Sequence, residues 1–129
     1  MRATLTNLAG AELVVNRGSS AVLVGTFTDL DSVTLDKGAI QSLVVSVYDP
    51  NAGRYLSGRK DQTILDANGG AVAADGTLTL RLSPDDLDVC ALSINEESFL
   101  FLTFKWQWTD DAGQQTGVAQ FELHIIGSP

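Results

Sequence analysis

Very few of the side chains on which catalytic and metal sites depend occur in this sequence. Its 129 residues include one cysteine, Cys90, and one histidine, His124. A zinc site needs several Cys or His ligands, and a Ser or Cys nucleophile needs a base beside it. A lone cysteine forms no internal disulfide, so Cys90 is interpreted as a small buried hydrophobic residue. We therefore expect a protein that is not an enzyme and that has no catalytic residue, metal or cofactor.

Basic charge is also scarce. Eight Lys and Arg residues stand against sixteen Asp and Glu residues, which gives a formal net charge of −8. The basic residues are scattered along the chain, and only Arg59 and Lys60 are adjacent. An acidic surface of this kind repels phosphate backbones, so nucleic acid is not an expected partner.

Long hydrophobic runs are missing as well. No purely apolar stretch exceeds four residues, as in 99–102, whereas a membrane-spanning helix needs about 20. The first seven residues contain no apolar core of the kind that a secretory signal requires. From the sequence we expect neither a membrane partner nor a secretory signal.

The acidic residues occur in several pairs, and each pair falls in a predicted turn or loop. Asp29 and Asp31, together with Asp36, faintly resemble a calcium-binding loop. The stretch lacks the glycine in mid-loop and the closing bidentate Glu that such a loop uses. We therefore interpret these carboxylates as solvated loop charge.

What the chain does contain is a set of alternating, β-type runs. Residues 98–108 (SFLFLTFKWQW) and 118–126 (VAQFELHII) flank a polar, Gly-containing turn, which predicts a β-hairpin. Every second residue from Leu100 to Trp108 is apolar, so this strand has one buried face. Trp106 and Trp108 fall on that face, which favours core packing over an exposed platform for stacking sugars. His124 alternates with apolar neighbours and is expected on the outward face.

Five further strands are expected, at residues 12–16, 20–28, 40–48, 63–67 and 77–82. Residues 29–38 read as a polar loop, and Ser83 followed by Pro84 predicts a short helical turn over 83–87. The order of a TLTL strand, a helical corner, a long aromatic strand, a turn and a last strand matches strands E, F and G of an immunoglobulin-like domain. We therefore predict an all-β fold: a single immunoglobulin-like β-sandwich over 1–129, with about seven to eight short antiparallel strands and one short helical turn.

One set of apolar side chains does not belong to the predicted core face. Strand F of such a domain lies between strands C and G. The side chains that point away from the core would then form an apolar and aromatic patch on one sheet, and the members of this predicted protein interface are Phe99, Phe101, Val44, Tyr48 and Val118. The alternative is that an N-terminal segment or a loop covers these residues.

Several stretches together resemble small immunoglobulin-like structural proteins of tailed bacteriophages and prophages. The most specific are residues 62–70 (QTILDANGG) and 80–85 (LRLSPD), and residues 25–29, 43–49 and 104–108 also contribute. The resemblance covers roughly residues 18–126. The chain departs from the pattern in the loop 29–38 and around Cys90.

This resemblance implies a structural role in the head or head-to-tail region of a virion, assembled in the host cytoplasm, and it supplies no catalytic residues. The implied partners are the major capsid protein or other virion proteins, with many copies of the chain per particle. A capsid decoration or cement protein that stabilises the head is the favoured function. The alternatives are a head-to-tail connector or tail-associated protein, and a carbohydrate-binding adhesion module that would need Trp106 or Trp108 exposed.

Overall fold

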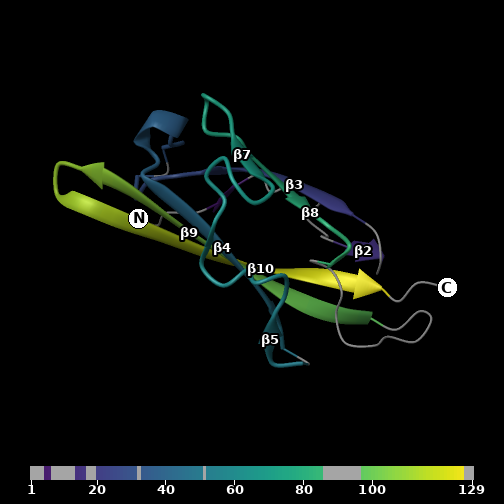
Figure 1. Cartoon of the computed structure of the whole chain (residues 1–129). Coiled ribbons are helices and arrows are strands. Elements are labelled where there is room, and N and C mark those ends of the chain that lie inside the picture. Colours follow the sequence, from purple (N-terminus) through teal and green to yellow (C-terminus); the bar gives the residue numbers. More distant parts are fainter. Residues whose placement is uncertain are drawn as a thin grey trace.

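Two β-sheets packed face to face form the molecule (Figure 1). The computed structural model describes residues 5–6, 14–16, 20–31, 33–50, 52–85 and 97–126. The four-stranded sheet contains, in spatial order, β1 (Leu5–Thr6), β3 (Ala21–Phe27), β8 (Leu78–Leu82) and β7 (Gly70–Val72). The six-stranded sheet contains β2 (Val14–Asn16), β10 (Gly113–Ile126), β9 (Glu97–Asp110), β4 (Ser42–Asp49) and β5 (Arg54–Tyr55), with β6 (Gln62–Thr63) also paired to β4.

The strand order is that of an immunoglobulin domain. Strands β3, β8 and β7 occupy the places of B, E and D, and β10, β9 and β4 occupy those of G, F and C. Among the described strands, all pairs are antiparallel except the short pairing of β2 with the end of β10, which is parallel. The predicted all-β, immunoglobulin-like sandwich is therefore confirmed, and seven of the described strands are three residues or longer.

The longest element is the β9–β10 hairpin, which extends past the end of the sandwich (Figure 1). Its strands pair from Gly113 opposite Asp110 to Ile126 opposite Glu97. The loop is therefore only two residues long, and Gly113 takes a φ of 110° that favours glycine. The Asp110 side chain accepts a hydrogen bond of 2.8 Å from the backbone N–H of Ala112 and closes the turn.

The core lies between the sheets and is built from the alternate residues that the sequence predicts. Leu100, Leu102, Phe104, Trp106 and Trp108 of β9 are all at most 2% exposed. They meet buried residues of the opposite sheet, namely Leu23, Phe27, Leu78, Leu80 and Leu82. The Trp106 ring packs 4.8 Å from that of Phe27, and its Nε1 donates to the Thr28 carbonyl at 3.1 Å. Both tryptophans therefore belong to the core.

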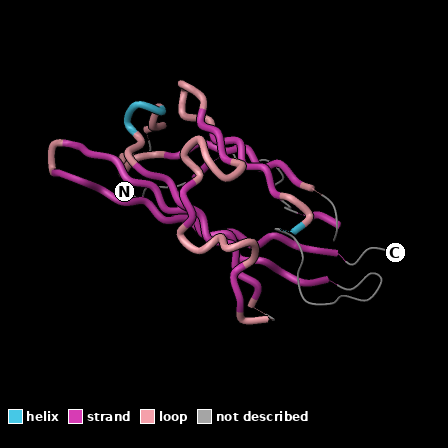
Figure 2. Tube along the Cα trace, in the orientation of Figure 1, coloured by secondary structure: helices cyan, strands magenta, loops and turns pink. Residues whose placement is uncertain are grey.

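Some local elements differ from the sequence prediction. The strand expected at 63–67 is reduced to Gln62–Thr63, because the chain leaves the sheet at Ile64 and Asp66 has a φ of 56°. Strands β1, β5 and β7 were not anticipated, since each is only two or three residues long. Figure 2 shows the helical segments, among them the single turn η1 (Lys37–Ala39), which begins in the expected loop 29–38 and ends one residue after it.

The helical turn expected at 83–87 is described only at its start. The chain turns at Pro84, and Asp85 has 3-10 conformation. The rest of that segment, including Cys90, lies outside the described residues. Within the described residues, no helix is long and apolar enough to cross a membrane.

Candidate functional site

The candidate site is the outer face of the six-stranded sheet, the face that points away from the four-stranded sheet. Strand β9 lies between β4 and β10, as the immunoglobulin order predicts. Opposite Phe101 lie Tyr48 on β4 and Glu122 on β10, and opposite Lys105 lie Val44 and Val118. The five residues of the predicted interface are thus on one face.

Aromatic side chains gather at one end of this face. Phe99 is 36% exposed, and its ring packs edge-on against His124 with 4.5 Å between the ring centroids. Tyr48 is half-buried and packs against Tyr55, which is 41% exposed, with 5.0 Å between centroids. With Phe101 between these two pairs, the four residues Tyr48, Tyr55, Phe99 and Phe101 form what we call the aromatic cluster.

A polar row separates the aromatic cluster from the other apolar residues. Ser46, Thr103 and Gln120 lie side by side on β4, β9 and β10. Asp61 joins this row from the loop before β6, since its backbone N–H donates to the Ser46 hydroxyl at 2.9 Å. Its carboxylate also lies 3.5 Å from the Lys105 ammonium. Both charges are about half exposed, so this ion pair contributes little to stability.

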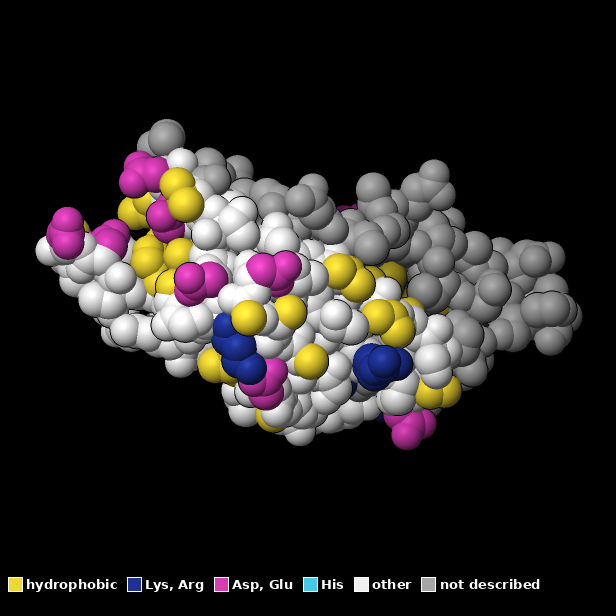
Figure 3. Space-filling view, turned by 90° about the horizontal axis from the view of Figure 1, so that it is seen from above, with side chains coloured by type: hydrophobic (Ala, Val, Ile, Leu, Met, Phe, Trp, Pro, Cys, Tyr) yellow, Lys and Arg dark blue, Asp and Glu magenta, His cyan; other side chains and the backbone are white. Residues whose placement is uncertain are grey.

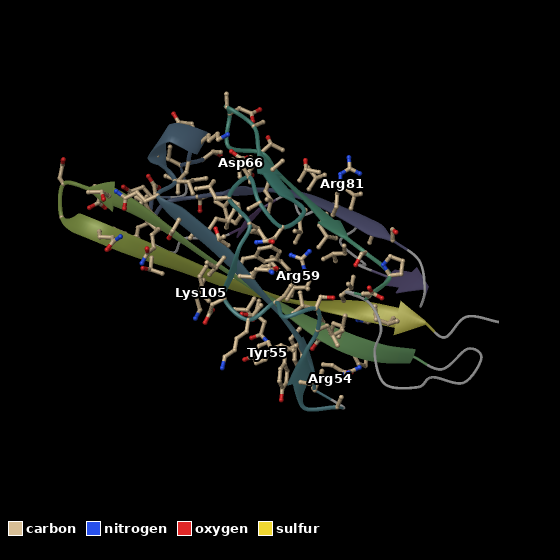
Figure 4. All side chains as sticks on the ribbon, in the orientation of Figure 1. Arg54, Tyr55, Arg59, Asp66, Arg81 and Lys105 are labelled. Atoms are coloured by element: carbon tan, nitrogen blue, oxygen red, sulfur yellow. The ribbon has the colours of Figure 1, made fainter. Side chains whose placement is uncertain are left out.

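Between the polar row and the aromatic cluster the surface is hollowed by about 280 Å³. Tyr48, Tyr55 and Phe101 form its apolar wall, and Asp61, Thr103, Lys105 and Gln120 line the polar side. In Figure 4, Tyr55 lies on β5 at the edge of this sheet, and the side chain of its neighbour Arg54 projects in a different direction. A face that combines exposed aromatic rings with a polar rim has the make-up of a protein-binding surface.

The five residues of the predicted interface therefore share one face, but they fall into two groups on it. Val118, 51% exposed, and Val44, half-buried, flank Lys105 on the far side of the polar row. The sequence analysis placed these residues on one sheet face but did not anticipate the polar row of Ser46 and Thr103 between them. It also missed Tyr55, which reaches Tyr48 through the tight β4–β5 turn, where Gly53 has a φ of 65°. The turn residues Pro50 and Gly53 were the signal that could have placed it.

The other candidate residues, two tryptophans and two aspartates, make contacts within the fold. Trp106 and Trp108 are 0% and 2% exposed, so the tryptophan platform required by the carbohydrate-binding alternative is not formed. The Asp29 carboxylate accepts hydrogen bonds from the backbone N–H groups of Asp31 and Val33, and Asp36 caps η1 through the N–H of Ala39. These hydrogen bonds do not favour a calcium site in this loop. In the part of the chain that is described, no group of three or more His, Cys, Asp or Glu residues could hold a metal ion.

Comparison with known proteins adds no relative. No protein-family model matches the sequence, and no curated protein matches it either. The resemblance to phage structural proteins therefore stays a prediction, while the immunoglobulin-like fold is shown by the strand order.

Proposed function

We propose that this chain is a non-enzymatic structural protein of a tailed-phage virion, which decorates the capsid and docks on it through the outer face of its six-stranded sheet. The observation that carries the proposal is the aromatic cluster, whose Phe99 and Tyr55 are 36% and 41% exposed. Aromatic residues are enriched at protein interfaces and provide most of their hot spots. The resemblance of residues 62–70 and 80–85 to structural proteins of tailed phages supports a phage virion as the particle.

The rest of the architecture suits a docking module. The two strands that carry most of the outer face, β9 and β10, are 14 residues each and pair along their whole length. Their inner residues are packed into the core, so the outer side chains are held on a rigid support. A pre-formed surface loses little conformational entropy when it binds.

Attachment to a shell adds a second advantage. A capsid presents many equivalent positions. A copy that bridges two neighbouring subunits makes two sets of weak contacts at once, and together these bind more tightly than either set alone. A decoration protein that joins subunits in this way stabilises the shell against the pressure of packaged DNA. The formal charge of −8 is compatible with a position outside the shell, where no contact with DNA is made.

The test is co-sedimentation of the purified protein with mature heads of the phage that encodes it. Phe99→Ala should weaken binding by about tenfold or more, as truncation of an aromatic hot spot does. Leu30→Ala is the matched control, since Leu30 is 38% exposed and lies in a loop away from the outer face. This control variant should bind as the wild type does.

Two results would overturn the proposal. Failure of the wild-type protein to bind any head form would remove the capsid role, and equal binding by the Phe99→Ala variant would remove the outer face as the docking surface. A closed six- or twelve-fold ring in native mass measurements, combined with no head binding, would instead favour the head-to-tail connector or tail-associated alternative.

A further inference from the structure

The four-stranded sheet ends at the short strand β7, and no strand lies beyond it in the part of the chain that the structure describes. On the side of β8, the N–H of Ala73 donates to the Thr77 carbonyl at 2.9 Å. Bonded and unbonded residues alternate along an antiparallel pair, so Ala71 also bonds to β8, whereas Gly70 and Val72 direct their N–H groups to the outer edge. An open edge of this kind accepts a strand of another chain.

Strand β7 itself lacks the features that usually protect an edge strand. Natural proteins place charged side chains or proline on such strands, or bend them away with a bulge. Residues 67–74 (ANGGAVAA) contain neither a charged residue nor a proline, and the register of β7 with β8 has no bulge. A second copy of the chain therefore meets no repulsion from β7, and any protection of this edge has to come from another segment.

That segment is residues 64–69, which we call the strap. The N–H of Gly70 donates to the Ala67 carbonyl at 2.9 Å, and the N–H of Val72 donates to Oδ1 of Asp66, also at 2.9 Å. Both donors that β7 directs to its outer edge are therefore satisfied inside the chain, which leaves neither of them for a strand of another molecule.

The strap is anchored at both of its ends. Ile64 is fully buried, and its N–H donates to the Leu43 carbonyl of β4 at 3.0 Å. A Cβ on Gly70 would lie only 2.7 Å from Cβ of Ile64, so glycine is what allows β7 to approach the strap so closely. At the other end, the Gly69 carbonyl accepts a hydrogen bond of 2.9 Å from the N–H of Arg81 on β8.

Between these anchors, the Asp66 side chain ties the strap to two other segments (Figure 4). Its Oδ1 accepts from Val72 of β7, and its Oδ2 forms an ion pair with Lys37 of η1. Figure 3, which views the molecule from the side of β7, shows basic side chains at two separate places, one of which adjoins acidic side chains. The two charges of the ion pair are 43% and 44% exposed, so the pair itself adds little stability. Its effect is to position the carboxylate for the hydrogen bond that closes the edge.

We infer that the strap prevents β7 from pairing with β7 of a second copy of this chain, and that the Asp66 carboxylate is the latch of this device. Without the carboxylate, the N–H of Val72 has no acceptor at the edge of the sheet. Two β7 strands then pair antiparallel about Ala71, because this two-fold contact gives each copy an acceptor for that N–H. The inference goes beyond the capsid proposal and does not depend on it.

The experiment compares the full-length Asp66→Ala variant with the wild type in two measurements. In dilute solution, the Val72 amide of the ¹⁵N-labelled variant should exchange its hydrogen about five- to tenfold faster, as expected for the loss of one hydrogen bond. In native mass measurements over a range of concentrations, the variant should form a dimer that the wild type does not form. Lys37→Gln is a milder second variant: it keeps the acceptor for Val72, so it should raise the exchange rate by a smaller factor.

Asp75→Ala is the matched control, because Asp75 is also exposed and its carboxylate also accepts a backbone N–H, that of Thr77, but in the turn between β7 and β8. This control should keep the wild-type mass. Adding Ala71→Lys to the Asp66→Ala variant places a charge on the exposed middle of the edge and should abolish the dimer. Unchanged exchange of the Val72 amide, a wild-type mass for Asp66→Ala, equal association of the control, or a dimer that survives Ala71→Lys would each overturn the inference. Circular dichroism of each variant confirms that the fold is intact.

Discussion

Replacing Gly117 by alanine tests the packing that holds the two sheets together. Gly117 lies on β10 directly opposite Trp106 on β9, and the indole ring covers it. A Cβ on Gly117 would overlap the ring, with only 2.7 Å to its Nε1. Since carbon atoms in contact normally lie about 3.5–4 Å apart, the ring would have to move. Trp106 is fully buried, so its displacement also disturbs Phe27.

The expected cost combines two effects. Forcing extra volume into a packed core costs about 1–3 kcal/mol, and the Trp106 hydrogen bond to the Thr28 carbonyl, now 3.1 Å, adds about 1 kcal/mol when it breaks. We therefore expect Gly117→Ala to lower the free energy of unfolding by about 2–4 kcal/mol. For a domain of this size the midpoint of thermal unfolding should fall by about 8–15 °C.

Urea unfolding and thermal unfolding, followed by tryptophan fluorescence and circular dichroism, measure the effect. Gly38→Ala is the matched control: a Cβ there meets only the Asp36 carboxylate, at an ordinary 3.6 Å, and its φ is not left-handed. This control should change the midpoint by no more than about 2 °C. Equal stability of the two variants would refute the packing of Trp106 on Gly117.

Two further predictions concern the core and one surface ion pair. Tryptophan emission of the native protein should be blue-shifted and resistant to acrylamide, because Trp106 and Trp108 are buried; red-shifted, readily quenched emission would contradict this. The hydrogen bond from Lys37, followed by that from the Val72 backbone, holds the pKa of the Asp66 carboxyl below its ordinary value. A lowered pKa in the folded state stabilises the protein above the unfolded pKa of about 4 and loses that effect as the pH falls. The Asp66→Asn variant keeps a side-chain oxygen that can accept the hydrogen bond from the Val72 backbone, but it loses the charge. The thermal midpoint of this variant should lie slightly below that of the wild type at pH 7, and the two midpoints should converge in acid. A difference that does not depend on pH would contradict the role of the charge.

The sequence was most informative where the strands are long. The alternation from Leu100 to Trp108 predicted both the buried face of β9 and the outward position of Phe99 and Phe101. It was least informative where tertiary contacts decide the structure. The segment 63–67 begins with the β-branched Thr63 and Ile64, yet the strand ends at Thr63, and Asp66 takes a φ of 56° that a strand does not allow.

The hollow that Arg59, Gly69 and Arg81 line shows why part of the surface could not be predicted. Arg59, Gly69 and Arg81 come from two loops and a strand, and no spacing in the sequence links them. Gly69 approaches both arginines closely, since a Cβ at this position would lie 2.7 Å from the Arg81 carbonyl oxygen and 3.4 Å from Nη2 of Arg59. Tyr55 is an intermediate case, since the turn before it was recognisable but the register across from Tyr48 was not.

The most direct test of the docking proposal is a cryo-electron microscopy reconstruction of phage heads incubated with the purified protein. The account predicts density for the sandwich on the outer surface of the shell, with Phe99, Phe101 and Tyr55 against the major capsid protein. Heads without added density, or a bound sandwich that contacts the shell through its four-stranded sheet, would contradict it.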